Sequence, residues 1–236
     1  MDPLDDFVAQ VSSVGALAEP ARRALYLHVA AQPGPVSRDQ AAAAVGVPRH
    51  TAKFHLDKLV ADGLLDVEFR RLSGRRGPGA GRPAKLYRRS ARQLAVSLPP
   101  RHYDLAGRIL AGAVDESARD GVPVREAVQR AAAAAGRRLA ADEDVRVADP
   151  SASVLDEVAR VLAGHGYEPR VEGDGVVLAN CPFHTLAREH TELVCGMNLH
   201  LVAALLDELG CSDLLEAALR PAPAHCCVRV VDRRHG

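Results

Sequence analysis

Signals that begin and end helices recur at short intervals over residues 19–63, and they constrain the fold of this part of the chain more than any other feature. Pro20 suits the first position of a helix. Ser37, with Gln40 three residues later, is a capping-box pattern that predicts the start of a second, shorter helix. A third helix over 48–62 follows at once, with an apolar stripe along one side and a glycine directly after it. The pattern predicts three short helices joined by tight turns.

A β-hairpin with a long basic tip is predicted directly after the third helix. Residues 64–70 and 84–88 have strand patterns, and RLSGRRGPGAGRP between them is rich in Gly, Pro and Arg. Helices joined by a tight turn and followed by such a hairpin are typical of a winged helix-turn-helix. The second helix of that motif, here the third predicted helix, reaches base edges in the major groove. Arginine in the wing suits phosphate and minor-groove contacts. We therefore predict that a double-stranded DNA operator is contacted by Arg49, His50, Thr51 and Lys53 in the third helix and by Arg75, Arg76 and Arg82 in the wing.

The charge distribution favours a polyanionic partner for this part of the chain. The formal net charge of the whole chain is zero, but residues 1–90 carry 14 Lys and Arg against 9 Asp and Glu. Residues 69–90 carry eight basic residues and no acidic one. A locally basic segment on a neutral protein indicates a surface for nucleic acid. A solvated charged loop is the alternative interpretation.

The segment VPRHTAKFHLDKLVADGLL resembles the winged helix-turn-helix domains of bacterial regulators of the broad ArsR and MarR-like type. The resemblance covers about residues 15–90. It implies DNA binding and transcription regulation, and we expect a repressor.

The remainder of the chain changes character twice. Residues 101–119, 124–141 and 151–164 have helical patterns bounded by Gly, Pro or Asp, and no catalytic motif occurs in them. From Tyr167 onward, YEPRVEGDGVVLAN predicts two strands turned at Gly173-Asp174-Gly175. A long amphipathic helix and a third strand complete the pattern, over 191–210 and 225–231.

The predicted fold is α+β and has three parts. They are a winged helix-turn-helix DNA-binding domain at 1–90, a helical linker or dimerisation region at 91–165, and a cysteine-rich sensor domain at 166–236, in which a small antiparallel sheet packs with helices.

All five cysteines follow residue 180. The sequence does not open with a signal-peptide pattern and contains no run of eighteen apolar residues, so we expect a cytoplasmic protein that does not enter a membrane. In a reducing compartment we do not expect a disulfide framework. Metal binding, redox chemistry and simple burial remain as roles for the thiols.

Three of the five cysteines can converge. A continuous helix of 1.5 Å per residue would place Cys211 about 24 Å from Cys195, which excludes it from a shared site. Cys181 at a strand end and Cys195 in the first turns of the helix remain. Of Cys226 and Cys227, only one is expected to point inward, because adjacent strand residues face opposite ways. With a histidine, three thiolates suit zinc or an iron–sulfur cluster. The candidate ligands are Cys181, His184, His190, Cys195, Cys226 and Cys227.

A winged-helix domain followed by NCPFH, then H-x4-C, then a late cysteine resembles the SufR-type iron–sulfur repressors. This resemblance covers about residues 165–230. It implies a homodimer in which three C-terminal cysteines hold a cluster whose state controls DNA affinity. The matching positions are Cys181, Cys195 and either Cys226 or Cys227, and the doubled cysteine departs from that family.

The leading hypothesis is therefore a transcription regulator, not an enzyme, with an iron–sulfur cluster as cofactor and zinc as the alternative. A structural zinc, a small-molecule effector site, thiol redox sensing without metal, and buried cysteines without a ligand remain open. A cysteine-dependent enzyme is a further alternative, with Cys181 or Cys195 as nucleophile and His190 as base. Against it, the sequence has no Gly-rich phosphate loop and no nucleophile elbow.

Overall fold

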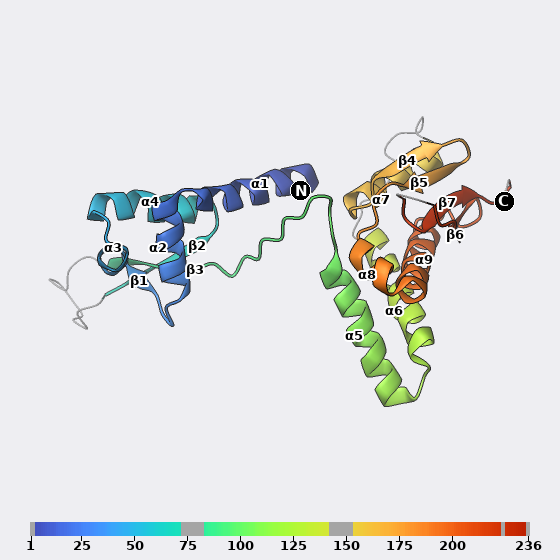
Figure 1. Cartoon of the computed structure of the whole chain (residues 1–236), viewed down its shortest axis with the longest axis horizontal. Helices are drawn as coiled ribbons and strands as arrows, with labels where there is room; N and C mark the ends of the chain where they lie inside the picture. Colours follow the sequence, from blue (N-terminus) through green and yellow to red (C-terminus); the bar gives the residue numbers. More distant parts are fainter. Residues whose placement is uncertain (1–2, 72–82, 142–152, 223–224, 235–236) are drawn as a thin grey trace. The chain divides into compact units, whose positions relative to one another are not determined.

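The computed structural model describes residues 3–71, 83–141, 153–222 and 225–234. The chain divides into two compact units, residues 1–96 and 97–236, and each contains helices and an antiparallel sheet (Figure 1). This confirms the predicted α+β class. No helix among the described residues is long and apolar enough to cross a membrane.

The first unit contains the three predicted helices and the predicted hairpin. Its elements are α1 (Pro3–Gly15), a short 3-10 helix η1 (Ala16–Ala18), α2 (Pro20–Ala30), β1 (Val36–Ser37), α3 (Arg38–Val45), α4 (Arg49–Ala61), β2 (Leu65–Arg70) and β3 (Ala84–Arg89). The strand order is β1-β3-β2, with both pairings antiparallel. The sequence did not indicate α1 or β1.

Local capping chemistry explains where these helices begin and end. The Glu19 carboxylate accepts hydrogen bonds from the first backbone N–H groups of α2. Ser37 and Gln40 form the predicted capping box at the start of α3. The chain leaves α3 at Gly46, whose φ of 72° is a left-handed conformation that favours glycine. These short helices pack through Leu25 of α2 and Leu56 of α4, both fully buried.

The second unit contains a helical part and a four-stranded sheet. Its elements are α5 (Tyr103–Asp120), α6 (Val124–Ala141), α7 (Val154–Gly164), β4 (Pro169–Glu172), β5 (Gly175–Leu178), α8 (His184–Glu189), α9 (Thr191–Glu208), β6 (Leu215–Leu219) and β7 (Val228–Asp232). The sheet is antiparallel throughout, in the order β4-β5-β7-β6.

One hydrophobic core joins the helices and the sheet of the second unit. It includes Ala135 of α6, Val161 of α7, Leu201 of α9 and Val230 of β7. The segments that we predicted as a helical linker and a separate sensor domain therefore lie in one compact unit. The physical reason is that α6 and α9 pack against each other along the alanine-rich face of α6, which leaves little apolar surface for a second core.

The register of β5 against β7 determines where Cys181 and Cys226 lie relative to each other. Val176 lies opposite Val230, so the end of β5 lies beside the start of β7. The backbone N–H of Cys226 donates to the carbonyl oxygen of Leu178 at 2.8 Å. Because Cys181 follows Leu178 by three residues, this pairing brings two cysteines that are far apart in the sequence to one end of the sheet.

Candidate functional site

The N-terminal half of α4 has a buried side and an exposed side. Ala52 and Leu56 are fully buried in the core of the first unit. The opposite side forms a shallow hollow that is lined by His50, Lys53, Phe54, Asp57 and Lys58. Of the predicted DNA contacts on this helix, Arg49, His50 and Lys53 are exposed and Thr51 is half-buried.

Arg49 is held by an ion pair in this structure. Its Nε donates to Oδ1 of Asp39 on α3 at 2.7 Å, and its Nη2 donates to Oδ2 of the same carboxylate. Hydrogen bonds from Arg49 first, and then from Arg38, lower the pKa of Asp39 below its usual value. The pair fixes the start of α4 against α3, so Arg49 can reach a phosphate only by sharing or leaving Asp39.

Phe54 is an exposed aromatic residue on the same side of α4. Its side chain is 65% exposed, in a chain with only four phenylalanines. The neighbouring His55 points inward instead and accepts a hydrogen bond from Nε of Arg22 at 3.4 Å. An apolar ring exposed between polar groups of a recognition helix is suited to contact with a thymine methyl group.

The described part of the wing adds further basic side chains. Arg70, Arg88 and Arg89 are exposed on β2 and β3. Lys85 and Tyr87 of β3 both donate hydrogen bonds to Oδ1 of Asp57, which joins the wing to α4. The three arginines predicted at the tip, Arg75, Arg76 and Arg82, lie outside the described residues.

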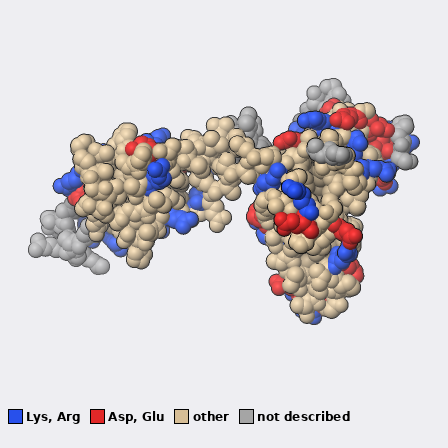
Figure 2. Space-filling view, viewed as in Figure 1, with Lys and Arg blue, Asp and Glu red and all other residues tan. Residues whose placement is uncertain are grey.

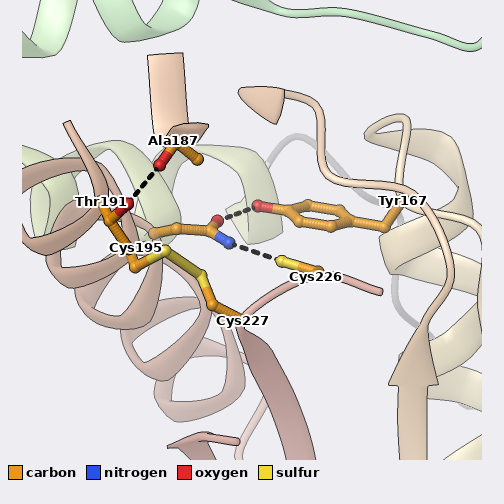
Figure 3. Close-up of a disulfide and its surroundings, with 7 residues drawn as sticks. Tyr167, Ala187, Thr191, Cys195, Cys226 and Cys227 are labelled. Carbon is orange, nitrogen blue, oxygen red and sulfur yellow. Dashed lines mark hydrogen bonds between the residues drawn. A yellow bond between two sulfur atoms is a disulfide. The ribbon is translucent and has the colours of Figure 1, made fainter. Parts of the chain in front are cut away.

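Four cysteines meet in the second unit, from three separate segments. Cys181 follows β5, Cys195 lies in the second turn of α9, and Cys226 and Cys227 directly precede β7. Cys195 and Cys227 form a disulfide with a Cα–Cα distance of 6.2 Å (Figure 3). The prediction of no disulfide is therefore wrong. It rested on the cellular compartment, whereas this pairing follows from α9 running beside the segment that leads into β7.

Cys181 and Cys226 form a second, non-covalent pair. Both are buried, and the thiol of Cys226 donates a hydrogen bond to the sulfur of Cys181. This hydrogen bond lowers the pKa of Cys181 despite its burial, and the positive charge of Arg101 acts in the same direction. The pKa of Cys226 is raised, chiefly because it supplies that proton and also because it is buried. Cys181 is therefore the more acidic thiol of the pair.

Asn198 connects this pair to the helix core. It is fully buried on α9, and its Nδ2 donates to Sγ of Cys226 at 3.2 Å. The hydroxyl of Tyr167 donates to its Oδ1 (Figure 3). Burial raises the pKa of Tyr167, so the phenol stays protonated and remains a donor. Sequence reasoning missed Asn198 and Tyr167, although an asparagine three residues after Cys195 in an apolar helix is a usable signal.

Arg101 was also missed by sequence reasoning. Its Nη1 donates to the carbonyl oxygen of Cys181 at 3.1 Å and to Oδ1 of Asn180. Nδ2 of Asn180 in turn donates to the carbonyl oxygens of Pro100 and Gly166. These bonds fix the chain on both sides of the Cys181 thiol.

The other candidate ligands do not join the cysteines. His184 and His190 are exposed at the two ends of α8. The backbone N–H of His184 donates to the carbonyl oxygen of Cys181 at 3.1 Å, but among the described residues no hydrogen bond joins either imidazole to a cysteine. Cys211 lies beyond α9, with its Sγ 3.5 Å from the carbonyl oxygen of Leu209. Across the part of the chain that the structure describes, no group of three or more His, Cys, Asp or Glu side chains is arranged to hold a metal ion.

The two adjacent cysteines are both used, contrary to the expectation that only one would point inward. Cys226 is buried against Cys181, and the half-buried Cys227 is bonded to Cys195. The side chains do point in different directions, but each direction leads to another cysteine. The opposite directions of the two adjacent side chains therefore give each cysteine a different partner, and both cysteines remain in the cluster.

A family model described as a helix-turn-helix domain matches residues 17–68. This region is a helix-turn-helix domain. It covers α2, α3, α4 and most of β2, and it supports a DNA-binding transcription regulator. The search of curated proteins found no match.

A solved structure of human N-acetylserotonin methyltransferase in complex with SAM is similar at 22% identity, over 60% of this chain and 48% of that one. The prediction that the chain is not an enzyme is corrected, because the protein it matches is an enzyme by its title. With a TM-score of 0.25, the likeness assigns neither a fold nor an activity to this chain.

Proposed function

We propose that this chain is a dimeric transcription regulator, acting as a repressor, whose affinity for a DNA operator is controlled through Cys181, Cys195, Cys226 and Cys227. The observation that carries the proposal is the convergence of these four cysteines from three segments, in a chain that also has a helix-turn-helix domain. A ligand or a redox change that favours one conformation of the second unit shifts the population that fits the operator.

The DNA contact is proposed to use α4 in the major groove. Arg49, His50, Thr51 and Lys53 lie in its first two turns, where recognition helices contact bases and phosphates. Phe54 adds an apolar contact on the same exposed side. In the wing, Arg75, Arg76 and Arg82 are proposed to contact phosphates or the minor groove.

We propose that the four cysteines ligate a cofactor once the disulfide is reduced, since in the disulfide form no described group of three is arranged to hold a metal ion. Reduction of the Cys195–Cys227 bond by a dithiol takes up two electrons and two protons and leaves four thiols in one neighbourhood. Thiolates are preferred ligands of iron–sulfur clusters and of structural zinc. An iron–sulfur cluster, the cofactor we propose, supplies a redox centre when bound, and zinc is the alternative.

The surrounding residues would prepare this set for a cofactor. The Cys226 thiol and Arg101 lower the pKa of Cys181, which makes its thiolate easier to form. Asn198 holds Cys226 in place. The Cys195–Cys227 disulfide withdraws two of the four ligands, so its formation opposes cofactor binding.

One test measures cofactor content and DNA affinity in the same samples. The full chain is purified without oxygen, reduced and loaded with iron and sulfide or with zinc. Absorption spectra and iron, sulfide and zinc contents are recorded, and operators are selected from random duplexes. We expect each of Cys181→Ser, Cys195→Ser and Cys226→Ser to lose the cofactor and its effect on DNA affinity.

Cys211→Ser is the matched control, because that cysteine lies outside the cluster. If all of these variants bind metal and DNA as the unsubstituted chain does, the control by cysteines is wrong and only DNA binding remains. If no duplex is selected, the regulator itself is refuted.

The disulfide favours a second candidate function, which is redox sensing by thiols alone. In this form, a peroxide or disulfide oxidant closes Cys195–Cys227 and a dithiol reopens it, with two electrons exchanged in each direction. Metal-free protein whose DNA affinity still changes with the redox state of these two cysteines would select this candidate over the cofactor.

A further inference from the structure

Helix α5 has one buried side and one exposed side. Ala106, Ile109 and Ala113 are buried in the core of the second unit and pack toward α6. The other side carries eight exposed residues, which are Asp104, Gly107, Arg108, Ala111, Gly112, Asp115, Ala118 and Arg119. Figure 2 shows a largely uncharged surface over the α5–α6 hairpin, with acidic and basic groups at its margins.

Four charges on this exposed side form a single row in alternating order. Asp104, Arg108, Asp115 and Arg119 are separated by four, seven and four residues. At 3.6 residues per turn, these spacings keep all four within an arc of about 60°. The charges alternate along the row as negative, positive, negative, positive. A second row that runs in the opposite direction therefore places an opposite charge beside each charge of the first.

We infer that α5 docks antiparallel on α5 of a second copy of this chain, about a two-fold axis that passes between Ala111 and Gly112. In this register Arg108 lies opposite Asp115 of the second copy, and Asp104 lies opposite Arg119 of the second copy. The symmetry repeats each pair once. An isologous contact requires a surface that is complementary to itself, which this row of charges provides. A partner of a single charge sign would meet two like charges.

The middle of the exposed side allows two helices to approach closely. A Cβ built on Gly107 or Gly112 meets nothing within 4 Å, so neither glycine is required by packing inside the chain. Glycine in a helix interior lowers helix stability, and a close contact with another backbone is a reason for its presence. Small residues at the crossing point reduce the distance between two packed helices.

A groove beside this row can receive side chains of the second copy. It lies between α5 and α6, has a volume of about 570 Å³, and has an apolar floor that includes Leu105, Ile109, Ala131, Ala135 and Leu139. Arg108 and Arg138 border it. Because Arg108 borders the groove and also belongs to the charged row, one docked helix would cover both.

Intrachain ion pairs compete only weakly with this arrangement. Arg108 already pairs with Asp104 at 3.1 Å, and Arg119 pairs with Asp120 at 3.3 Å. All four side chains are about half or more exposed, so these pairs are screened by water and can be exchanged or shared. The α5 interface would supply the dimer of the proposed function. Only the role of this dimer in operator binding rests on that proposed function.

The test is the molar mass of the full chain, without DNA and with a reductant that prevents intermolecular disulfides. Sedimentation is recorded over a concentration series. We expect a dimer, which either Arg108→Glu or Asp115→Arg weakens by about tenfold, because each reversal puts like charges opposite each other at two places. The double variant restores the affinity, and Gly112→Leu weakens the dimer without a change of charge.

Arg170→Glu on β4 is the matched charge reversal away from α5, and it is expected to leave the dimer unchanged. Circular dichroism confirms that each variant is folded. A monomer at all concentrations, a dimer that ignores both reversals, or a double variant that fails to recover would overturn the inference. A monomer that still binds DNA refutes only the α5 interface, whereas a dimer that binds no DNA refutes the proposed function and keeps the interface.

Discussion

Gly136 on α6 lies directly against the backbone of Leu201 on α9. A Cβ added at Gly136 would stand 2.1 Å from the carbonyl oxygen of Leu201, far inside contact distance. Neither helix can move away without disturbing the core that the two share. The close packing of α6 on α9 thus depends on one missing methyl group.

We expect Gly136→Ala to lower the free energy of unfolding by about 2–3 kcal/mol, because the overpacking outweighs the better helix propensity of alanine. Urea unfolding followed by circular dichroism measures the change. Gly196→Ala on α9 is the control, since a Cβ there meets nothing within 4 Å, and it should raise stability by about 0.5–1 kcal/mol. Equal stability of Gly136→Ala and the unsubstituted chain would contradict the packing described.

Trypsin can verify the pairing of the cysteines. No cleavable Lys or Arg occurs between 189 and 229, because Arg220 is followed by proline, so Cys195 and Cys227 share one tryptic peptide. Cys181 lies in the preceding peptide, 171–188. We expect mass spectrometry of the oxidised protein to find a disulfide inside the 189–229 peptide, and a second cut by a protease specific for acidic residues to separate Cys195 from Cys227 only after reduction. A covalent link between the two tryptic peptides would instead mean that Cys181 is oxidised.

Removing the Tyr167 hydroxyl should destabilise the second unit. Tyr167→Phe leaves Oδ1 of the buried Asn198 without its donor, and we expect a loss of about 1–2 kcal/mol. Tyr103→Phe makes the same change where the hydroxyl bonds Thr185 at the surface, and should cost much less. Thermal unfolding of the two variants side by side measures the difference, and equal losses would argue against the buried bond.

Phe54 and Lys53 should affect DNA binding in different ways. We expect Phe54→Ala to weaken binding about fivefold without changing the salt dependence, since it removes an apolar base contact. Lys53→Ala should reduce the slope of log affinity against log salt by about one, as expected for a phosphate contact. Fluorescence anisotropy over a salt series distinguishes them. Unchanged affinity of both variants would mean that this side of α4 does not face DNA.

The hydrogen bonds of Asp57 predict that the stability of the first unit depends on pH. Partial burial alone would raise its pKa, but hydrogen bonds from Lys85 and Tyr87 outweigh burial and lower it below the ordinary value of 3.8. The stabilisation is therefore complete above that value and is lost as pH falls through the lower, folded-state pKa. Asp57→Asn should be less stable than the unsubstituted chain near neutral pH, and the gap should narrow in acid. Asp66→Asn, at an exposed pair with Arg88, is the control and should show little effect.

Capping and turn chemistry made the first unit readable from sequence. Ser37 with Gln40, and Gly46 after α3, act through neighbouring residues alone, so their roles could be predicted. The two-residue β1 could not be predicted, because it exists only through its pairing with β3. The six-residue helix α8 has no capping side chain and left no signal in the sequence either.

In the candidate site, too, features set by neighbouring residues could be predicted, and features set by contacts between distant segments could not. Spacing along the helix placed Cys211 away from Cys195, and in the structure Cys211 lies beyond the end of α9. Which cysteine meets which depends on the register of β5 against β7, and that register is a property of the folded sheet. Asn198 escaped prediction for the same reason, since its partners Tyr167 and Cys226 lie 31 and 28 residues away in the chain.

The bonds that run from Tyr167 through Asn198 to Cys226 also provide an optical reporter. The chain contains no tryptophan, so the weak emission of its four tyrosines, Tyr167 among them, is not masked. A change at the Cys226 sulfur alters the environment of Asn198, and through it the phenol of Tyr167. Intrinsic tyrosine fluorescence can therefore follow the state of the thiols in the unlabelled protein.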